Sequence, residues 1–389
     1  MKFRGEGGKG SSASRITPPL GVRWKIKLQE SGAASSGANS GEKLKSLNPP
    51  VVIGDTIYFG SDDGNFYALD VESGYMRWVF KSGAEINSIP YVDKDQVYFG
   101  SKDGKLYALS RETGQEIWHF QTHSQINSQV ERYKDYIVFV GDADAIYFLS
   151  PDGREQFTVD NPGWYHYTFL MADDVMYFGT SPTVSTVGPY DINQRKFLWH
   201  LDFSEIGSTW YSVSAALGDL IYFGTADYFG EMYLGFYAFN RYTGRMVWEQ
   251  GREGVFGENW LFENKGRFFL RNIELLDFMA PSLWKDLVIY AGGDSAARAF
   301  DAKTGLLRWE QVFDAPVSSA PTVAAGRVYF GVLGDDFTPP KLVCISARDG
   351  KLLWQMETEG SLLSAPVIAG KRIIFGTDES VFYVLEQVF

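Results

Sequence analysis

A pattern of fourteen residues runs Ile57-Tyr58-Phe59-Gly60-Ser61-Asp62-Asp63-Gly64-Asn65-Phe66-Tyr67-Ala68-Leu69-Asp70. It returns 40 residues later as Val97-Tyr98-Phe99-Gly100-Ser101-Lys102-Asp103-Gly104-Lys105-Leu106-Tyr107-Ala108-Leu109-Ser110. A glycine and a tryptophan follow at the same spacing both times, as Gly74 with Trp78 and as Gly114 with Trp118. Repeats of this length indicate a solenoid or a propeller, in which each unit buries its apolar face against its neighbour.

The repeat continues along the whole chain. The anchor of the repeat is a short run that starts with an aromatic or β-branched residue and leads into glycine. Its first residue occurs eight times, at Tyr58, Tyr98, Val138, Tyr177, Tyr222, Ile289, Tyr329 and Ile374. The aromatic residue after each turn occurs seven times, at Trp78, Trp118, Phe157, Trp199, Trp248, Trp309 and Trp354. The last unit ends at Phe389 without one, whereas Trp24 lies in an alternating strand that no anchor precedes. Residues 18–28 are therefore expected to complete the last unit and to close a ring.

Each unit is predicted to contain four antiparallel strands. In the second unit the expected strands are Ser88–Val92, Gln96–Gly100, Lys105–Leu109 and Glu116–Phe120, because apolar residues alternate there between short polar turns. Asp63-Gly64 joins the second strand to the third, where Asp-Gly favours a two-residue hairpin turn. The predicted fold is all-β: an eight-bladed β-propeller of four-stranded antiparallel blades, closed by the N-terminal strand, in a single domain over residues 1–389.

Composition and charge limit the class of partner. The 389 residues carry a net charge of -12, with no segregated basic stripe, and this disfavours nucleic acid. No apolar run is long enough for a transmembrane segment. The single cysteine, Cys344, cannot form an intramolecular disulfide, and its alternating neighbours indicate a small buried side chain. The expected state is a monomer.

Two segments depart from the repeat. Residues 29–46 are polar and rich in Gly and Ser, and they are expected to form a flexible surface loop. Residues 249–287 are predicted to be an insertion between blades, because one interval between anchors is 67 residues long. The insertion carries Phe256, Trp260, Phe262, Arg267, Phe268, Phe269 and Arg271. These side chains either cap the channel or form a partner-binding surface, since aromatic residues and arginine are common interface anchors.

The innermost strand of each blade is expected to line the central channel. The small polar residues expected there are Asn87, Ser88, Asn127, Ser128, Ser318, Ser319 and Ser364. The fourth and fifth units carry aromatic residues in the equivalent stretch, namely Tyr165, Tyr167, Trp210 and Tyr211. This aromatic group either packs within the ring or stacks a planar ligand or a sugar. The residues expected to dock each blade on its neighbour are Trp24, Trp78, Trp118, Trp199, Trp248, Trp309 and Trp354.

The repeat resembles that of a known family of propellers. Ala68-Leu69-Asp70 with Gly74 and Trp78, and Ala299-Phe300-Asp301 with Thr304-Gly305 and Trp309, are similar to the repeat of the PQQ-like (quinoprotein-type) eight-bladed propellers. The enzymes of that class use two adjacent cysteines joined as a disulfide, a calcium ion held by acidic and amide side chains, and a catalytic Asp. A single cysteine excludes the disulfide, and no position matches the catalytic Asp or the calcium ligands. No catalytic, cofactor-binding or metal-binding residue is therefore predicted, and no cofactor is expected.

The chain therefore resembles the non-catalytic, BamB-like branch of this family. The resemblance implies a scaffold of the periplasm or cell envelope that binds protein, such as a component of the machinery that assembles β-barrel proteins in the outer membrane. A leader or lipid anchor, not visible in this sequence, is expected to have been removed. Two alternatives use the central channel: a PQQ-dependent oxidoreductase with calcium, and a sensor of a small ligand or glycan.

Overall fold

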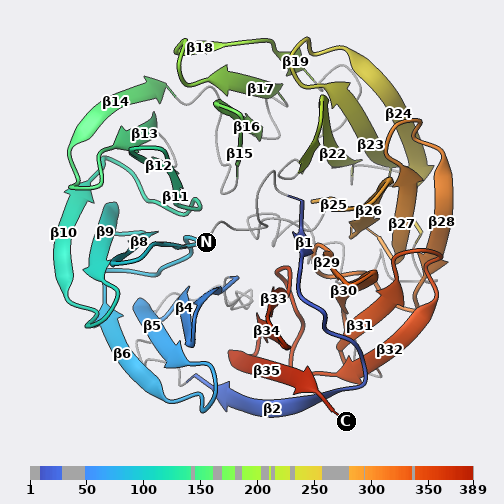
Figure 1. Cartoon of the computed structure of the whole chain (residues 1–389), viewed down its shortest axis with the longest axis horizontal. Helices are drawn as coiled ribbons and strands as arrows, with labels where there is room; N and C mark the ends of the chain where they lie inside the picture. Colours follow the sequence, from blue (N-terminus) through green and yellow to red (C-terminus); the bar gives the residue numbers. More distant parts are fainter. Residues whose placement is uncertain are drawn as a thin grey trace, which may run out of the picture.

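Eight sheets stand around a central axis like the blades of a wheel (Figure 1). The computed structural model describes residues 9–28, 49–141, 145–160, 169–179, 186–202, 210–211, 215–227, 233–255, 280–292, 294–334 and 338–388. All statements about structure below concern these residues. Within them, no helix has the length and apolar character that crossing a membrane requires.

The first four blades follow each other along the chain, each from its inner strand outward. Blade 1 contains β3 (Val51–Ile53), β4 (Thr56–Gly60), β5 (Asn65–Asp70) and β6 (Met76–Lys81). Blade 2 contains β7 (Tyr91–Val92), β8 (Gln96–Gly100), β9 (Lys105–Ser110) and β10 (Glu116–Gln121). Blade 3 contains β11 (Glu131–Tyr133), β12 (Tyr136–Val140), β13 (Ala145–Leu149) and β14 (Glu155–Asp160). Blade 4 contains β15 (Leu170–Ala172), β16 (Val175–Gly179), β17 (Thr186–Asp191) and β18 (Lys196–Phe197), with β19 (Leu201–Asp202) also paired to β17.

The other four blades complete the ring. Blade 5 contains β20 (Trp210–Tyr211) and β21 (Ala215–Leu217), both paired to β22 (Leu220–Asp227), then β23 (Tyr233–Asn240) and β24 (Met246–Glu253). Blade 6 contains β25 (Ser282–Trp284), β26 (Leu287–Ala291), β27 (Ala296–Asp301) and β28 (Leu307–Val312). Blade 7 contains β29 (Thr322–Ala324), β30 (Arg327–Val332), β31 (Lys341–Ser346) and β32 (Leu352–Glu357), with β1 (Ser11–Ser12) added on the inner side. Blade 8 contains β33 (Val367–Ala369), β34 (Arg372–Gly376), β35 (Val381–Gln387) and β2 (Leu20–Lys27).

The N-terminal strand closes the ring, as predicted. Strand β2 pairs antiparallel with β35 from Leu20 opposite Gln387 to Lys27 opposite Val381, so the head of the chain supplies the outer strand of blade 8 (Figure 1). The indole Nε1 of Trp24 then donates to the backbone oxygen of Val71 in blade 1, at 2.9 Å. The last blade is thereby joined to the first.

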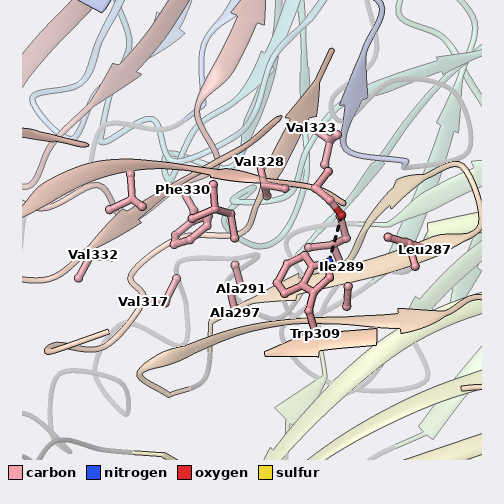
Figure 2. Close-up of a cluster of buried hydrophobic side chains, with 14 of the residues drawn as sticks. Leu287, Ile289, Ala291, Ala297, Trp309, Val317, Val323, Val328, Phe330 and Val332 are labelled. Carbon is pink, nitrogen blue, oxygen red and sulfur yellow. Dashed lines mark hydrogen bonds between the residues drawn. The ribbon is translucent and has the colours of Figure 1, made fainter. Parts of the chain in front are cut away.

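The apolar core lies between the blades. The buried side chains form eight clusters, and each cluster draws mainly on two adjacent blades. One cluster joins blades 8 and 1, which confirms closure: it includes Ile374 and Phe382 together with Ile57 and Phe59. Figure 2 shows the cluster between blades 6 and 7. The second strands of the blades are buried on both faces, as in β4 and β26, whereas outer strands such as β6 and β10 alternate between exposed and half-buried residues.

Two local expectations differ from the structure. The inner strand of blade 2 is only Tyr91–Val92, because Pro90 has no N–H and the Ile89 oxygen accepts the Val130 N–H at 2.9 Å instead of a bond within the blade. The two-residue turn predicted at Asp63-Gly64 is wrong. Ser61 N–H donates to the Asn65 oxygen at 3.0 Å, so the link has three residues and ends with Gly64 at φ 77°.

The outer strand of blade 5 is longer than expected. Strand β24 continues to Glu253, and β25 begins at Ser282. The first residues of the stretch 249–287 therefore extend blade 5, and its last residues begin blade 6. Residues 29–46 and 256–279 lie outside the described residues.

Candidate binding sites on the channel wall and between blades 5 and 6

The small polar residues of the inner segments hold neighbouring blades together. Ser88 Oγ donates to the backbone oxygen of Ser128 at 2.6 Å, from blade 2 to blade 3. Ser128 Oγ accepts from the backbone N–H of Val140 at 2.8 Å. Both serine side chains are buried. Their hydroxyl groups are therefore engaged in the ring itself.

The same kind of bond recurs around the ring. Gln129 Nε2 donates to the backbone oxygen of Phe169 at 2.8 Å, from blade 3 to blade 4. Ser282 Oγ donates to the backbone oxygen of Pro321 at 2.6 Å, from blade 6 to blade 7. A buried carbonyl without a donor costs about 1–3 kcal/mol, so Gln129 and Ser282 stabilise the junctions between blades. Within blade 7, Ser319 Oγ accepts from the N–H of Gly331 at 2.9 Å.

The other expected channel residues are placed as follows. Asn87 is half-buried, and Asn127, Ser318 and Ser364 are buried. The hydroxyl of Ser318 has no hydrogen-bond partner among the described residues.

The aromatic and insertion candidates lie mostly outside the described part of the chain. Trp210 and Tyr211 form β20, and only their backbone is described. The remaining candidates outside the described residues are Tyr165, Tyr167, Phe256, Trp260, Phe262, Arg267, Phe268, Phe269 and Arg271.

Each tryptophan of the outer strands contacts the next blade. The indole N–H of Trp248, for example, donates to the backbone oxygen of Ala302 at 3.0 Å. The indole ring of Trp248 also covers Gly305, where an added Cβ would lie 2.7 Å from the nearest indole carbon. The same indole-to-carbonyl bond is made by Trp24, Trp78, Trp118, Trp199 and Trp309. Trp354 packs against the cluster between blades 7 and 8.

The junction of blades 3 and 4 uses other residues. Phe157 occupies the tryptophan position, and Arg195 occupies the turn position that is glycine elsewhere. The Arg195 guanidinium lies 4.2 Å from the centre of the Phe157 ring, a cation–π contact. Beside this junction is a hollow of about 350 Å³, which Lys134, Tyr136 and Asn193 help to line.

A buried ionic network lies in blade 6. The Arg298 guanidinium binds both oxygens of Asp294, at 3.0 and 2.7 Å, and its Nε binds Glu310 at 2.6 Å. The side chains of Arg298 and Asp294 are 1% and 0% exposed. Burial raises the pKa of the Asp294 carboxyl, and Arg298 opposes that shift. The bonds to Asp294 and Glu310 outweigh the opposing effect of burial and raise the pKa of Arg298.

This network also holds the end of blade 5. Asp294 Oδ2 accepts the N–H of Val255 at 2.8 Å, and the Ser295 N–H donates to the Val255 oxygen at 2.7 Å. A hollow of about 710 Å³ adjoins it, lined by Tyr233, Gly251, Arg252, Glu253, Gly254, Val255 and Glu310. Its mixed carboxylate and guanidinium lining suits a zwitterionic or peptide-like group.

Sequence reasoning missed this network, although a signal existed. Arg298 occupies the position in the third strand that is tyrosine in five other blades, at Tyr67, Tyr107, Tyr147, Tyr237 and Tyr383. A charged residue in a repeated aromatic position indicates a buried partner of opposite charge. A second missed residue is Glu131 on β11, which is 6% exposed and accepts from Gln129 Nε2 at 3.3 Å.

The described residues do not match the donor set that the resemblance implies for a quinone with calcium. Cys344, the only cysteine, lies on β31, and burial raises the pKa of its thiol to about 12. Within the part of the chain that the structure describes, no three His, Cys, Asp or Glu side chains gather as a metal site would require. The polar groups of the inner wall are engaged mainly with the backbone of the ring.

The architecture and the repeat define the class: this is an eight-bladed β-propeller of the PQQ-like type. The family described as outer membrane protein assembly factor BamB matches residues 21–132, 102–261, 237–338 and 332–388, and the chain belongs to that family. Among curated protein sequences, none matches this chain.

Solved structures of different function share the fold. BamB from Moraxella catarrhalis is 16% identical, with 94% of this chain and 97% of that chain covered and a TM-score of 0.66. The computationally designed Ika8 protein is 14% identical, with 88% and 96% covered and a TM-score of 0.68. Quinohemoprotein alcohol dehydrogenase from Comamonas testosteroni is 15% identical, with 94% and 76% covered and a TM-score of 0.67. At these identities the likeness shows the fold alone.

Proposed function

We propose that this chain is a non-catalytic propeller scaffold that binds a protein partner in the cell envelope. The observation that carries the proposal is family membership over almost the whole chain, because the family is described by an assembly factor of the outer membrane. The strands of a propeller are committed to the ring, so its surfaces and loops are the parts that bind partners.

The chemistry of the channel wall supports a scaffold more than an enzyme. The hydroxyls of Ser88 and Ser128 bond to neighbouring backbone, and the thiol of Cys344 is buried. The Ser88, Gln129 and Ser282 side chains bond across the junctions between blades, which favours a structural role for them.

The partner surface that we propose is the insertion beginning at Phe256. Its sequence is rich in aromatic residues and arginine, the types that dominate binding energy at interfaces. The residue before it, Val255, is fixed by two hydrogen bonds to Asp294 and Ser295. Because its point of attachment is firmly held, the insertion has a lower entropy cost of binding.

Affinity capture tests this role. The tagged chain is compared with a variant in which residues 257–278 are replaced by a short Gly-Ser linker, and with a length-preserving variant in which Trp260, Phe268 and Phe269 are serine. A captured envelope protein, identified by mass spectrometry and purified, should bind the unchanged chain and lose at least tenfold in affinity for both variants. Equal binding by all three chains, with equal melting temperatures, would remove the insertion as the partner surface.

A quinone titration tests the enzymatic alternative. Addition of pyrroloquinoline quinone with Ca²⁺ is expected to give no change in quinone absorbance and no dye reduction with alcohols, because the donor set is not matched. Saturable quinone binding together with alcohol oxidation would overturn the scaffold role. The result of the affinity capture does not determine the result of the quinone titration, so each tests its own claim.

A further inference from the structure

The segment Lys9–Ile16 lies on the inner side of three blades. Its strand β1 pairs in parallel with β29, with Ser11 opposite Val323 and Ser12 opposite Ala324. Every other described strand pair is antiparallel. In Figure 1 the segment runs as a dark blue trace from the middle of the wheel outward to β2.

Main-chain contacts hold the first part of the segment. The oxygen of Lys9 accepts the N–H of Leu283 in blade 6 at 2.8 Å, and the oxygen of Gly10 accepts the N–H of Val323 in blade 7 at 2.8 Å. The buried hydroxyl of Ser282 lies 3.1 Å from the same Gly10 oxygen. These inner strands therefore present backbone donors to an extended chain, which is how sheet edges bind peptides.

One apolar side chain anchors the other end. Ile16 is 0% exposed and packs in the cluster that contains Ala324 and Tyr329 of blade 7 and Ile373 of blade 8. The Tyr329 hydroxyl donates to the Ile16 oxygen at 3.2 Å. Between the two ends the residues are small: Ser11, Ser12, Ala13 and Ser14.

The closure of the ring does not depend on this segment. Blade 8 is completed by β2, and blade 7 already has four strands without β1. The segment thus occupies an edge that a propeller blade normally leaves unpaired. Its pattern is that of a bound ligand: backbone hydrogen bonds for affinity and one buried side chain for specificity.

We propose that the inner edge of blade 7, with the flanking edges of blades 6 and 8, is a binding site for an extended peptide, and that residues 9–16 occupy it as a tethered ligand. The peptide class is a run of small residues followed by a single aliphatic residue, as in Gly10-Ser11-Ser12 with Ile16. This site goes beyond the scaffold role, because it is separate from the insertion and assigns its own ligand.

The tether makes the site self-occupied. A segment linked to its own site competes at an effective concentration that reaches millimolar for short connections. A free peptide of similar affinity is therefore excluded from the full chain, and release of the segment opens the site.

Peptide binding to a shortened chain tests the proposal. A chain that begins at Thr17 keeps all of β2, and the probe is a fluorescent synthetic peptide of residues 9–16. We expect saturable binding to the shortened chain and binding at least tenfold weaker to the full chain. A peptide with Ile16→Asp and a scrambled peptide serve as controls and should bind at least tenfold more weakly.

A full-length variant covers the case in which the shortened chain does not fold. In the Ile16→Asp chain the aliphatic anchor is lost while every strand remains. Hydrogen exchange at the Leu283 and Val323 amides should be at least tenfold faster than in the unchanged chain, and the added peptide should restore protection. Absence of saturable peptide binding to both chains, or protection confined to other strands, would overturn the site.

Discussion

Arg298 is one of two buried arginines in the described part of the chain, with Arg241, and it pairs with two carboxylates. Asp294 binds it with two oxygens and Glu310 with one. A buried ion pair adds little net stability compared with a well-packed apolar pair, but loss of one member leaves an uncompensated charge. The network therefore makes blade 6 sensitive to single substitutions.

Arg298→Met should lower the free energy of unfolding by about 3–5 kcal/mol, because Asp294 would remain buried without its partner. Urea unfolding followed by tryptophan fluorescence measures the change. Arg308→Met is the matched control: this arginine is half-exposed and pairs with Asp301 on the surface, so its loss should cost about 1 kcal/mol or less. Equal effects of the two substitutions would contradict the role given to burial.

The carboxyl group of Asp378 is expected to make the stability of the fold depend on pH. Burial raises the pKa of its carboxyl to about 6. In the unfolded chain the group titrates near its ordinary pKa of about 4. The folded state therefore binds more protons between these values, and the free energy of unfolding falls as the pH rises from about 4 to about 6.

Asp378→Asn should remove this loss of stability with rising pH. The variant is expected to be more stable than the unchanged chain by about 1–3 kcal/mol at pH 7 and equally stable below pH 4. The amide oxygen can still accept the Ser361 N–H that the carboxylate accepts at 2.7 Å. Urea titrations at several pH values give the result, and a difference that does not change with pH would contradict the pKa assigned to Asp378.

At the scale of the elements, the turn between the third and fourth strands joins one blade to the previous one. Gly305 has φ 71° and lies under the Trp248 ring, which also donates to the Ala302 oxygen. Glycine is required here twice, once for the positive φ and once for the close approach of the indole. The turn and the tryptophan therefore form a single structural unit that belongs to two blades.

Gly305→Ala should cost about 3 kcal/mol or more, because the new Cβ would lie 2.7 Å from the indole in addition to the strained φ. Gly370→Ala separates the two effects. Gly370 has φ 59° but nothing within 4 Å of an added Cβ, so only the strain of about 1 kcal/mol remains. Thermal unfolding of both variants measures the difference, and melting temperatures that fall equally would show that the indole contact contributes little.

At the scale of the whole molecule, closure makes the two ends of the chain interdependent. Eight core clusters fill eight junctions, and the cluster between blades 8 and 1 includes the partly buried Trp24 and Ile26 of β2. Arg23 of the same strand pairs with Glu72 of blade 1 and Glu386 of blade 8. Removal of β2 would expose the edge of β35 and open two core clusters.

A chain that begins at Gln29 should therefore lose most of its stability and self-associate, whereas a chain that begins at Thr17 should remain folded and monomeric. The difference arises because β2 makes seven residue pairings with β35, while β1 makes two with β29. Size-exclusion chromatography with light scattering and urea unfolding measure both effects. A stable monomer without β2 would contradict closure by the N-terminal strand.

Prediction from sequence succeeded for features that repeat. The eight anchors lie on the second strands of the eight blades, and each is paired with the same position of the first strand, as Tyr58 with Val51 and Ile374 with Val367. A repeated unit carries its signal several times, so chance matches in one copy do not mislead. The missing outer strand at the C-terminus and the spare strand at Trp24 were enough to predict closure.

Features that occur once could not be derived in this way. The buried bond from Ser88 to Ser128 joins residues 40 positions apart in the chain, and a serine in the sequence does not show whether its hydroxyl meets solvent or a neighbouring blade. The parallel pairing of β1 also depends on how the blades meet. Asp294 and Arg298 are only four residues apart, but their burial depends on the packing around blade 6.

The sequence by itself determined the all-β class, the number of blades, the closing strand and the family resemblance, because these follow from periodic patterns of apolar residues and turns. The tertiary structure alone decided which polar side chains form hydrogen bonds between blades, which residues pair with the buried Arg298, and where residues 9–16 lie. The physical reason is that contacts between blades join segments far apart in the chain, and that the energy of a buried pair such as Asp294–Arg298 depends on burial that exists only after the ring has closed.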